Sequence, residues 1–369
     1  MKPLHLVLFF TRNVSLRTWA QNGSLEREIA LYRCLQQEGI RVSFITYGNK
    51  ADLRFRDQLQ DIEILCNRWN LPLGWYERLI PLLHARTLSD ASLIKTNQTR
   101  GAEVALRVAR VWHKPLIARC GYMWSDLAAH SDRHLEAERA RSIEGKVFPS
   151  ARRVVVTTPL MKEYIIRHYN LSPAQVWVIP NFVLTDVFVP DDSQSVPNRI
   201  CFVGRFDQDK NLPALIRACA GLSVELYLIG DGQLRSALRD LAKQLNVKVQ
   251  MPGNLPHHEL PNLLRSAALF VLVSPHEGHP KSLLEAMACG VSVMGADSPG
   301  IREQIVHGET GWLCGTDPES IRAAIQHLLA NPGLRHQLGL NARKYIVANY
   351  SLERIVEQEL RLIKEIVTL

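Results

Sequence analysis

The sequence lacks the features that mark disulfide-rich, zinc-stapled and membrane-spanning proteins. Its seven cysteines are scattered and form no C-x-x-C pair, which argues against a disulfide framework and a zinc module. Apolar runs such as Ala267 to Val273 fall well short of the ~20 residues that a membrane span needs. The run that ends at Phe10 is too brief for a secretory signal. We therefore expect a cytoplasmic protein with reduced cysteines, soluble or associated with the cytoplasmic face of a membrane.

The common nucleotide-binding fingerprints are also missing. No G-x-G-x-x-G follows the first strand-like run, where the connection from Thr11 to Gly23 is long and carries one glycine. A phosphate loop of the form G-x-x-x-x-G-K-[ST] is likewise absent, and no recognised nucleic-acid module is present. These absences disfavour a dinucleotide-dependent dehydrogenase, a P-loop enzyme and a nucleic-acid binder.

The length and charge of the chain are informative. With 369 residues and 46% hydrophobic residues, the chain exceeds the roughly 250–300 residues of a single core, so two domains are expected. Residues 1–185 hold 26 Lys and Arg against 16 Asp and Glu, while residues 186–369 hold 18 against 20. The whole basic excess lies in the first half. Nucleic acid, an anionic membrane, an acidic ligand or an ordinary solvated surface could each account for it.

Strand-like and helix-like patterns alternate along the first half, which predicts βαβ units and a parallel sheet. Ser24 is a candidate N-cap for the helix that ends at Gly39. The predicted strands are Leu4 to Phe10, Val42 to Thr46, Leu116 to Arg119, Val154 to Thr157 and Val176 to Pro180, and further helices are Glu103 to Val111 and Met161 to His168.

The pattern breaks between Val183 and Asn198, then restarts. We predict a Rossmann-like domain at residues 1–185, a linker at 186–198, a second Rossmann-like domain at 199–350 and a final helical segment at 351–369. Ligands of such sheets bind outside the carboxyl ends of the strands. Predicted strands of the second domain are Ile200 to Val203, Glu225 to Ile229, Val247 to Met251, Ala268 to Val273 and Val291 to Met294, with helices Leu212 to Cys219, Leu234 to Leu245, Glu259 to Arg265, Ser282 to Cys289, Pro318 to Leu329, Pro332 to Asn349 and Leu352 to Ile366.

The densest polar motif runs from Ser274 to Gly290, where a predicted strand ends and a predicted helix begins. Amides near Gly278 to Ser282 would point from the helix N-terminus toward an anionic or polyhydroxyl ligand. Glu277 and Glu285 could accept hydrogen bonds from vicinal sugar hydroxyls. Taken alone, surface carboxylates are the other interpretation of both residues.

Two shorter motifs follow predicted strands. Gly204-Arg205 with Lys210 offers a close backbone approach and two cations, which suits a diphosphate. Asp207 and Asp209 between them resemble a D-x-D metal site, although charge balance with the cations is the simpler interpretation. Gly230-Asp231-Gly232 permits a tight turn at a strand end.

Together these motifs resemble the retaining glycosyltransferases of family 4, which have the GT-B fold of two doubly wound α/β domains facing across a cleft. Further matches are Val178-Ile179-Pro180-Asn181, the segment Ser298 to Glu303 and the segment His307 to Leu313. The resemblance is strong over about residues 176–350 and looser before them. It implies that the first domain receives the acceptor, the second binds the donor, and the final helix crosses back onto the first.

The resemblance assigns roles residue by residue. Arg205 and Lys210 would clamp the donor diphosphate and neutralise the leaving nucleotide. Glu277 would bind the donor sugar and Glu285 the ribose hydroxyls, so that Arg205, Lys210 and Glu277 are the catalytic candidates. The expected donor contacts are Gly23, Cys120, Gly204, Arg205, Lys210, Gly230, Asn254, Leu255, Glu277, Gly278, His279, Pro280, Lys281, Ser282, Leu283 and Glu285.

One departure concerns the first domain. Many family members carry a histidine after a strand near its carboxyl edge that touches the donor sugar, and the nearest match here is Cys120 after Arg119. Either residue could line the pocket instead. A buried thiol beside a structural arginine is the other interpretation.

The predicted function is that of a retaining hexosyltransferase that needs no metal or other cofactor and moves sugar from a UDP- or GDP-sugar to a hydroxyl acceptor. The expected acceptor is a carbohydrate or lipid-linked precursor in cell-surface polysaccharide, lipopolysaccharide or glycolipid synthesis. A GT-B epimerase, a sugar phosphorylase and a non-catalytic sugar-nucleotide-binding protein are the alternatives. The sequence does not predict the oligomeric state. Cations that could hold the first domain against anionic lipid or an acidic acceptor include Arg54, Arg56, Arg68, Arg78 and Arg86.

Overall fold

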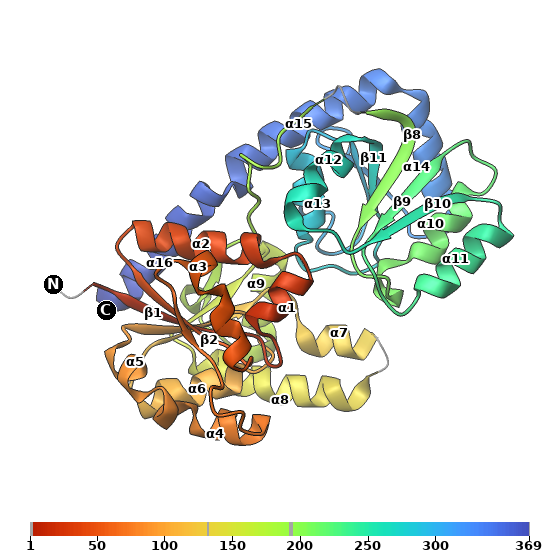
Figure 1. Ribbon diagram of the computed structural model, residues 1–369. Coiled ribbons are helices and arrows are strands. Elements are labelled where there is room, and N and C mark those ends of the chain that lie inside the picture. The colour runs from red at the N-terminus through yellow and green to blue at the C-terminus, as the bar shows by residue number, and fades with distance from the viewer. Residues whose placement is uncertain (1–2, 131–132, 192–194, 369) are drawn as a thin grey trace. The chain divides into compact units, whose positions relative to one another are not determined.

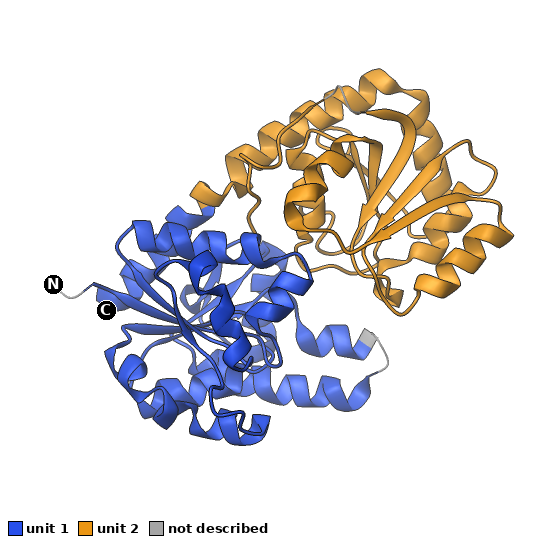
Figure 2. Ribbon diagram, viewed as in Figure 1, with its two compact units in different colours: residues 1–180, 355–369 blue, residues 181–354 orange. Residues whose placement is uncertain are grey.

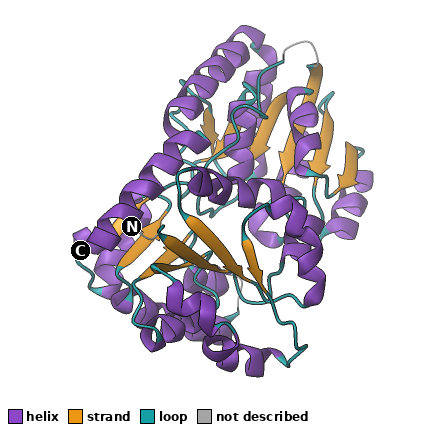
Figure 3. Cartoon of the chain, turned by 60° about the vertical axis from the view of Figure 1, so that its left-hand side comes forward, coloured by secondary structure: helices purple, strands orange, loops and turns teal. Residues whose placement is uncertain are grey.

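The structure of the protein is a computed structural model that describes residues 3–130, 133–191 and 195–368. The chain forms two compact units (Figure 2). Unit 1 comprises residues 1–180 and 355–369, and unit 2 comprises residues 181–354. Each unit has its own hydrophobic core and its own parallel sheet, with helices beside the strands (Figure 3). This is the two-domain, Rossmann-like architecture predicted from the sequence.

Unit 1 is built on a seven-stranded sheet in the order β3-β2-β1-β4-β5-β6-β7, in which every pairing is parallel. The chain order reverses beside β1, which creates a topological switch point at the carboxyl edge. All five residues of β1 are buried, as expected for a strand covered on both faces. The strands are β1 (His5–Phe9), β2 (Arg41–Ile45), β3 (Glu63–Leu65), β4 (Leu93–Thr96), β5 (Leu116–Cys120), β6 (Arg153–Val156) and β7 (Val176–Val178).

The helices of unit 1 lie in two layers. Figure 1 shows α2, α3 and α16 on one side of the sheet and α4, α5, α6 and α8 on the other, as right-handed crossovers in opposite directions from β1 require. Their bounds are α1 (Leu16–Gln21), α2 (Leu25–Gln37), α3 (Arg56–Leu59), α4 (Leu73–Leu83), α5 (Ala85–Asp90), α6 (Ala102–Val111), α7 (Trp124–His130), α8 (His134–Ser150), α9 (Pro159–Tyr169) and α16 (Leu352–Thr368).

The predicted strands and helices of unit 1 are confirmed, with two differences. Ser24 does not cap α2: its hydroxyl donates instead to the Trp19 carbonyl at 3.3 Å. Gly23 adopts a positive φ of 69°, and the connection before it contains α1, capped by Ser15. The turn between α1 and α2 therefore uses the Ser24 hydroxyl, which leaves the first amides of α2 without a side-chain cap.

Unit 2 is built on a six-stranded sheet in the order β10-β9-β8-β11-β12-β13, with every pairing parallel. Its strands are β8 (Val196–Val203), β9 (Glu225–Ile229), β10 (Lys248–Gly253), β11 (Ala267–Leu272), β12 (Val293–Ala296) and β13 (Trp312–Cys314). Its helices are α10 (Leu212–Cys219), α11 (Arg235–Gln244), α12 (Leu260–Arg265), α13 (Lys281–Ala288), α14 (Pro318–Ala330) and α15 (Pro332–Tyr350), together with the short 3-10 helices η4 (Gln208–Lys210) and η5 (His257–Glu259).

The segment expected to link the domains packs partly on unit 2. Phe188 is fully buried in the core of unit 2, and its carbonyl accepts a hydrogen bond from Arg343 at 2.5 Å. Val183 donates its amide to the Tyr350 carbonyl at 2.9 Å. Residues 192–194 of the predicted linker lie outside the described residues. The chain thus joins the fold of unit 2 from Asn181 onward.

The last helix, α16, is fixed within unit 1 by two ion pairs. Lys95 on β4 lies 2.5 Å from Glu359, with both side chains fully buried. Arg153 at the start of β6 lies 2.5 Å from Glu365. The residues of α16 from Ile355 onward belong to unit 1. Over the described residues, no helix combines the length and apolar character needed to cross a membrane.

Candidate functional site

The candidate site lies at the carboxyl edge of the sheet of unit 2. Strands β8 and β11 are parallel neighbours, so the loops that follow them leave the sheet side by side. The first loop carries Gly204, Arg205 and Lys210, and the second carries Glu277. The fold therefore brings together two motifs that the sequence separates by 67 residues.

Lys210 and Glu277 meet directly at this edge. The ammonium nitrogen of Lys210 donates to Oε1 of Glu277 at 2.5 Å, and the two side chains are only 15% and 11% exposed. The backbone of Glu277 packs closely against Gly300, whose φ is +81°. A Cβ at position 300 would lie 2.3 Å from the Glu277 carbonyl oxygen, so only glycine permits this approach. A cation and a carboxylate are thus fixed side by side at the carboxyl edge of the sheet.

Arg205 occupies a more open position than Lys210. Its side chain is 72% exposed, and the guanidinium lies 3.2 Å from the carboxylate of Asp207. Asp207 therefore balances a cation, which agrees with the simpler interpretation of the D-x-D pattern. Within the described part of the chain, no three His, Cys, Asp or Glu side chains are grouped as metal ligands would be.

Glu285 is buried and paired with a histidine. It lies on α13, is 2% exposed, and its Oε1 is 3.0 Å from Nε2 of His257, which is 4% exposed. The ring of Phe188 packs against the imidazole at 5.0 Å between centroids. His257 is not among the site residues predicted from the sequence. The only available signal was its place two residues after Leu255, because the contact with Glu285 depends on the neighbouring packing of η5 and α13.

Two glycines allow the backbones at the ends of β8 and β9 to approach closely. Gly230 has a φ of +133°, and a Cβ on it would lie 1.9 Å from the Gly204 carbonyl oxygen. A Cβ on Gly204 would in turn lie 2.8 Å from the Phe202 ring. Any larger residue at Gly230 would displace the loop that carries Arg205.

The loop before α13 is anchored around His279. The His279 carbonyl accepts from Nδ2 of Asn181 at 2.6 Å, and its buried ring packs 5.2 Å from the ring of Tyr350. Pro280 is the N-cap of α13 and provides no side-chain cap, so the first amides of the helix are not covered by a capping side chain. Leu283 lies in the core of unit 2, so only its backbone could contact a ligand.

The remaining candidates differ in accessibility. In unit 2, Gly278, Lys281, Ser282 and Leu255 are half-buried and Asn254 is exposed. In unit 1, Cys120 ends β5 with a fully buried side chain whose thiol donates to the Tyr122 carbonyl at 3.1 Å. Burial raises the pKa of this thiol to about 12, so it stays protonated at neutral pH. The structure thus gives Cys120 the surroundings of a core residue.

Two family models match the chain, one for each predicted domain. Glycosyltransferase Family 4 matches residues 29–187, and Glycosyl transferases group 1 matches residues 189–345. The chain belongs to the family 4, group 1 glycosyltransferases.

Relatives of this glycosyltransferase extend over most of its length. The alpha-maltose-1-phosphate synthase of Mycolicibacterium smegmatis is 26% identical over 326 residues, which cover 76% of this chain and 84% of the relative. The sucrose-phosphate synthase structure from Thermosynechococcus elongatus gives a TM-score of 0.80 at 19% identity and covers 99% of both chains. Anabaena HepE in complex with UDP and glucose gives 0.77 at 16% identity, with 98% of this chain and 99% of HepE covered. These structures establish the GT-B fold.

Proposed function

We propose that this glycosyltransferase transfers a sugar, with retention of anomeric configuration and without a metal ion, from a UDP- or GDP-sugar to a hydroxyl acceptor. The observation that carries the proposal is the Lys210–Glu277 pair at the strand edge that also presents Arg205 and leads into the helix of Glu285. The acceptor belongs to cell-surface polysaccharide, lipopolysaccharide or glycolipid synthesis. Retention, metal independence and this acceptor class rest on the family resemblance.

The surroundings of the side chains support the roles that the family resemblance implies. Lys210 already donates to a carboxylate in a half-buried position, so a diphosphate beside it would meet a preorganised cation. Glu277 would then accept hydrogen bonds from sugar hydroxyls. Exposed Arg205 would bind the same diphosphate and help to neutralise the charge that develops on the leaving nucleotide.

Glu285 is suited to the ribose because it is fixed in position. Nε2 of His257 lies 3.0 Å from one carboxylate oxygen, which restricts the orientation of the Glu285 side chain. A buried carboxylate of defined orientation can discriminate a diol from a singly hydroxylated ring, because an unmatched buried acceptor is costly. HepE, which shares the fold, binds UDP according to the description of its structure.

The test is turnover of a panel of UDP- and GDP-sugars by the purified full chain, followed as release of free nucleotide. We expect slow hydrolysis of one donor that falls about 10²–10³-fold in Lys210→Ala, the range seen when an oxyanion-stabilising donor is removed. Lys248→Ala is the matched control. Lys248 also pairs with a carboxylate, that of Glu225, but it is the first residue of β10 and therefore lies at the end of the strand away from the candidate site. Proton NMR of the product anomeric centre reports retention or inversion.

Three outcomes would overturn parts of the proposal. An inverted product would exclude retention, and activity abolished by a chelator and restored by a divalent ion would exclude metal independence. Conversion of an intact sugar nucleotide to its epimer would support the epimerase alternative. Nucleotide binding without turnover in any acceptor extract would support a non-catalytic binding protein.

A further inference from the structure

The outer helical layer formed by α4, α5, α6 and α8 of unit 1 concentrates exposed positive charge. Residues 68–90, 102–114 and 134–152, all of them described, hold ten Lys and Arg and six Asp and Glu. Nine of the ten cations are exposed, whereas Glu138 is the one exposed carboxylate among the six. The ten cations are Arg68, Arg78, Arg86, Arg107, Arg110, Lys114, Arg139, Arg141, Lys146 and Arg152.

Carboxylates of this layer interact with residues outside it. Glu77 pairs with Arg12 at 2.5 Å, and buried Glu144 accepts from the Ser125 amide and the Tyr169 hydroxyl. Three of the cations, by contrast, donate to neutral groups. Arg107 donates to the Glu77 carbonyl at 2.6 Å, Arg110 to the Ser150 hydroxyl at 2.9 Å, and Lys114 to the Ser89 carbonyl at 2.8 Å. Their positive charge is therefore not cancelled within the layer.

The helical layer on the other side of the sheet of unit 1 has no excess of positive charge. Helices α2, α3 and α16 with their flanking residues 24–39, 50–61 and 352–368, all described, hold eight Lys and Arg and ten Asp and Glu. Of these two helical layers, only the first carries an excess of positive charge. Arg54 and Arg56, which the sequence grouped with Arg78 and Arg86, belong to the balanced layer (Figure 1).

Large apolar side chains are exposed within the basic layer. On α4, Trp75, Arg78 and Leu82 follow one another at spacings of three and four, so they share one face of the helix. Trp75 is 57% exposed and Leu82 is 73% exposed, and the Arg78 guanidinium lies 5.7 Å from the centre of the Trp75 ring. The same helix is anchored from below by buried Tyr76 and Ile80.

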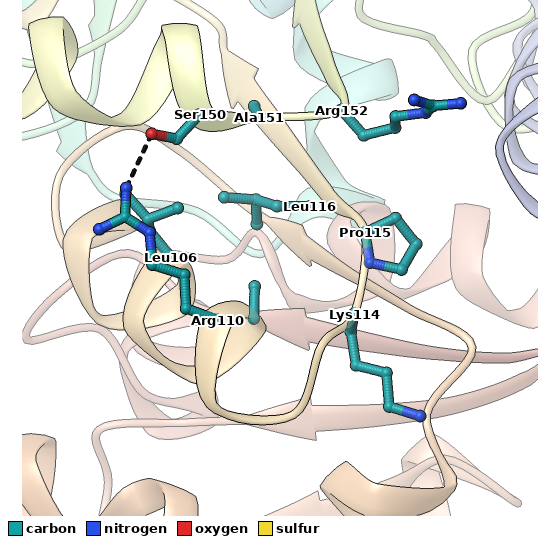
Figure 4. A pocket seen from close by; sticks show the side chains of 9 residues that line it. Leu106, Arg110, Lys114, Pro115, Leu116, Ser150, Ala151 and Arg152 are labelled. Carbon is teal, nitrogen blue, oxygen red and sulfur yellow. Dashed lines mark hydrogen bonds between the residues drawn. The ribbon is translucent and has the colours of Figure 1, made fainter.

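This face continues onto α6 and into a pocket. The Trp112 indole nitrogen donates to the Pro81 carbonyl at 3.2 Å, which fixes the end of α6 beside the end of α4. Just beyond lies a pocket of about 440 Å³ with an apolar floor and a cationic rim (Figure 4). The rim carries Arg110, Lys114, Arg152 and Ser150, and the floor includes Leu106 and Leu116.

We propose that the α4–α6 face, defined by Trp75, Arg78, Leu82, Arg110 and Lys114, binds an anionic membrane surface. Trp75 and Leu82 enter the boundary between headgroups and acyl chains, where amphipathic and aromatic side chains are most stable. The cations lie in the phosphate layer, and the pocket receives a lipid phosphate. Exposed leucine between arginines favours lipid over nucleic acid, whose phosphates offer no apolar phase. This inference concerns a face separate from the donor site and does not rest on the proposed function.

The experiment is co-sedimentation of the purified full chain with vesicles of pure phosphatidylcholine or of phosphatidylcholine with 30 mol% phosphatidylglycerol. We expect binding to the anionic vesicles that weakens when salt is raised from 0.1 to 0.5 M, because exposed charges are screened. The triple variant Arg78→Gln/Arg110→Gln/Lys114→Gln should lower the partition coefficient on the order of 100-fold, at ~1 kcal/mol for each cation near the surface.

Two further variants separate charge from insertion and location. Trp75→Ser/Leu82→Ser should weaken binding at both salt concentrations, because it removes the salt-independent part of the attraction. The charge-matched control Lys50→Gln/Arg54→Gln/Arg56→Gln removes three exposed cations from the opposite layer and should change binding by less than about threefold. Thermal unfolding of each variant verifies that it is folded.

The proposal is overturned if the protein shows no preference for anionic over neutral vesicles. It is equally overturned if the control variant loses as much binding as the α4–α6 variant, since that would indicate a response to net charge alone. Binding to a single-stranded oligonucleotide, lost in the same triple variant while vesicles are ignored, would assign the face to nucleic acid instead.

Discussion

Replacing Lys95 by methionine should destabilise unit 1 by about 3–5 kcal/mol, because it leaves the Glu359 carboxylate buried without its partner. Both side chains are fully buried and their charged atoms are 2.5 Å apart, so water cannot compensate for the loss. Glu359→Leu should cost a similar amount by leaving the Lys95 ammonium unpaired. These losses far exceed those expected for an exposed ion pair.

The double variant Lys95→Met/Glu359→Leu tests whether each single variant is destabilised by the unpaired buried charge that it leaves. The second carboxylate oxygen of Glu359 has no hydrogen-bond partner. The attraction within the pair therefore offsets only part of the desolvation free energy of the two buried charges. We therefore expect the double variant to lie within about 1 kcal/mol of the parent or to be more stable, although each single variant is impaired. The coupling between the two sites is the measured quantity.

Urea unfolding followed by tryptophan fluorescence is the appropriate assay. Six of the seven tryptophans lie in unit 1, so the signal reports mainly on the unit that contains the pair. Glu365→Gln is the control on the same helix: its partner Arg153 is half-buried and Glu365 is 35% exposed, so the loss should stay near 1 kcal/mol or below. A double variant as damaged as the sum of the singles would refute this account.

Three other substitutions test the packing of both units. Burial, reinforced by the charge of Arg68, lowers the pKa of His84 from 6.5 to about 4. As the pH falls, His84 therefore becomes protonated in the unfolded chain before it does in the folded protein. The free energy of unfolding should drop by up to about 3 kcal/mol between pH 6.5 and 4, at about 1.4 kcal/mol per pH unit. His84→Gln should remove this dependence on pH. His257→Ala should raise KM for the sugar nucleotide about tenfold with little change in kcat, because it releases Glu285, and His257→Gln should recover part of the loss; equal effects of both variants would contradict a positioning role. Gly230→Ala should abolish donor binding in isothermal titration, since its Cβ would collide with a carbonyl oxygen at 1.9 Å, whereas Gly333→Ala, with open space around it, should bind normally.

The sequence was enough to place the donor-site candidates of unit 2 at strand ends and helix starts, because the signals for these positions are local. Gly204, Lys210, Glu277 and Glu285 each follow a strand-like run or open a helix-like one, and parallel strands place their carboxyl ends on one edge. Periodicity in the second half likewise predicted α10 at Leu212–Cys219 with its observed bounds. These features are determined by short segments and need no knowledge of distant packing.

Tertiary structure decided the partners of those residues. No spacing rule links His257 to Glu285 or Lys95 to Glu359, because each pair joins elements that are brought together only by the order of the strands and the return of the last helix. The sequence likewise located the basic excess in the first half, but it did not show that one helical layer is basic and the other is not. The sequence does not distinguish Arg78 from Arg54, because both are basic residues of the first half. Only the crossover of the chain around β1 places them in opposite layers, one basic and one balanced.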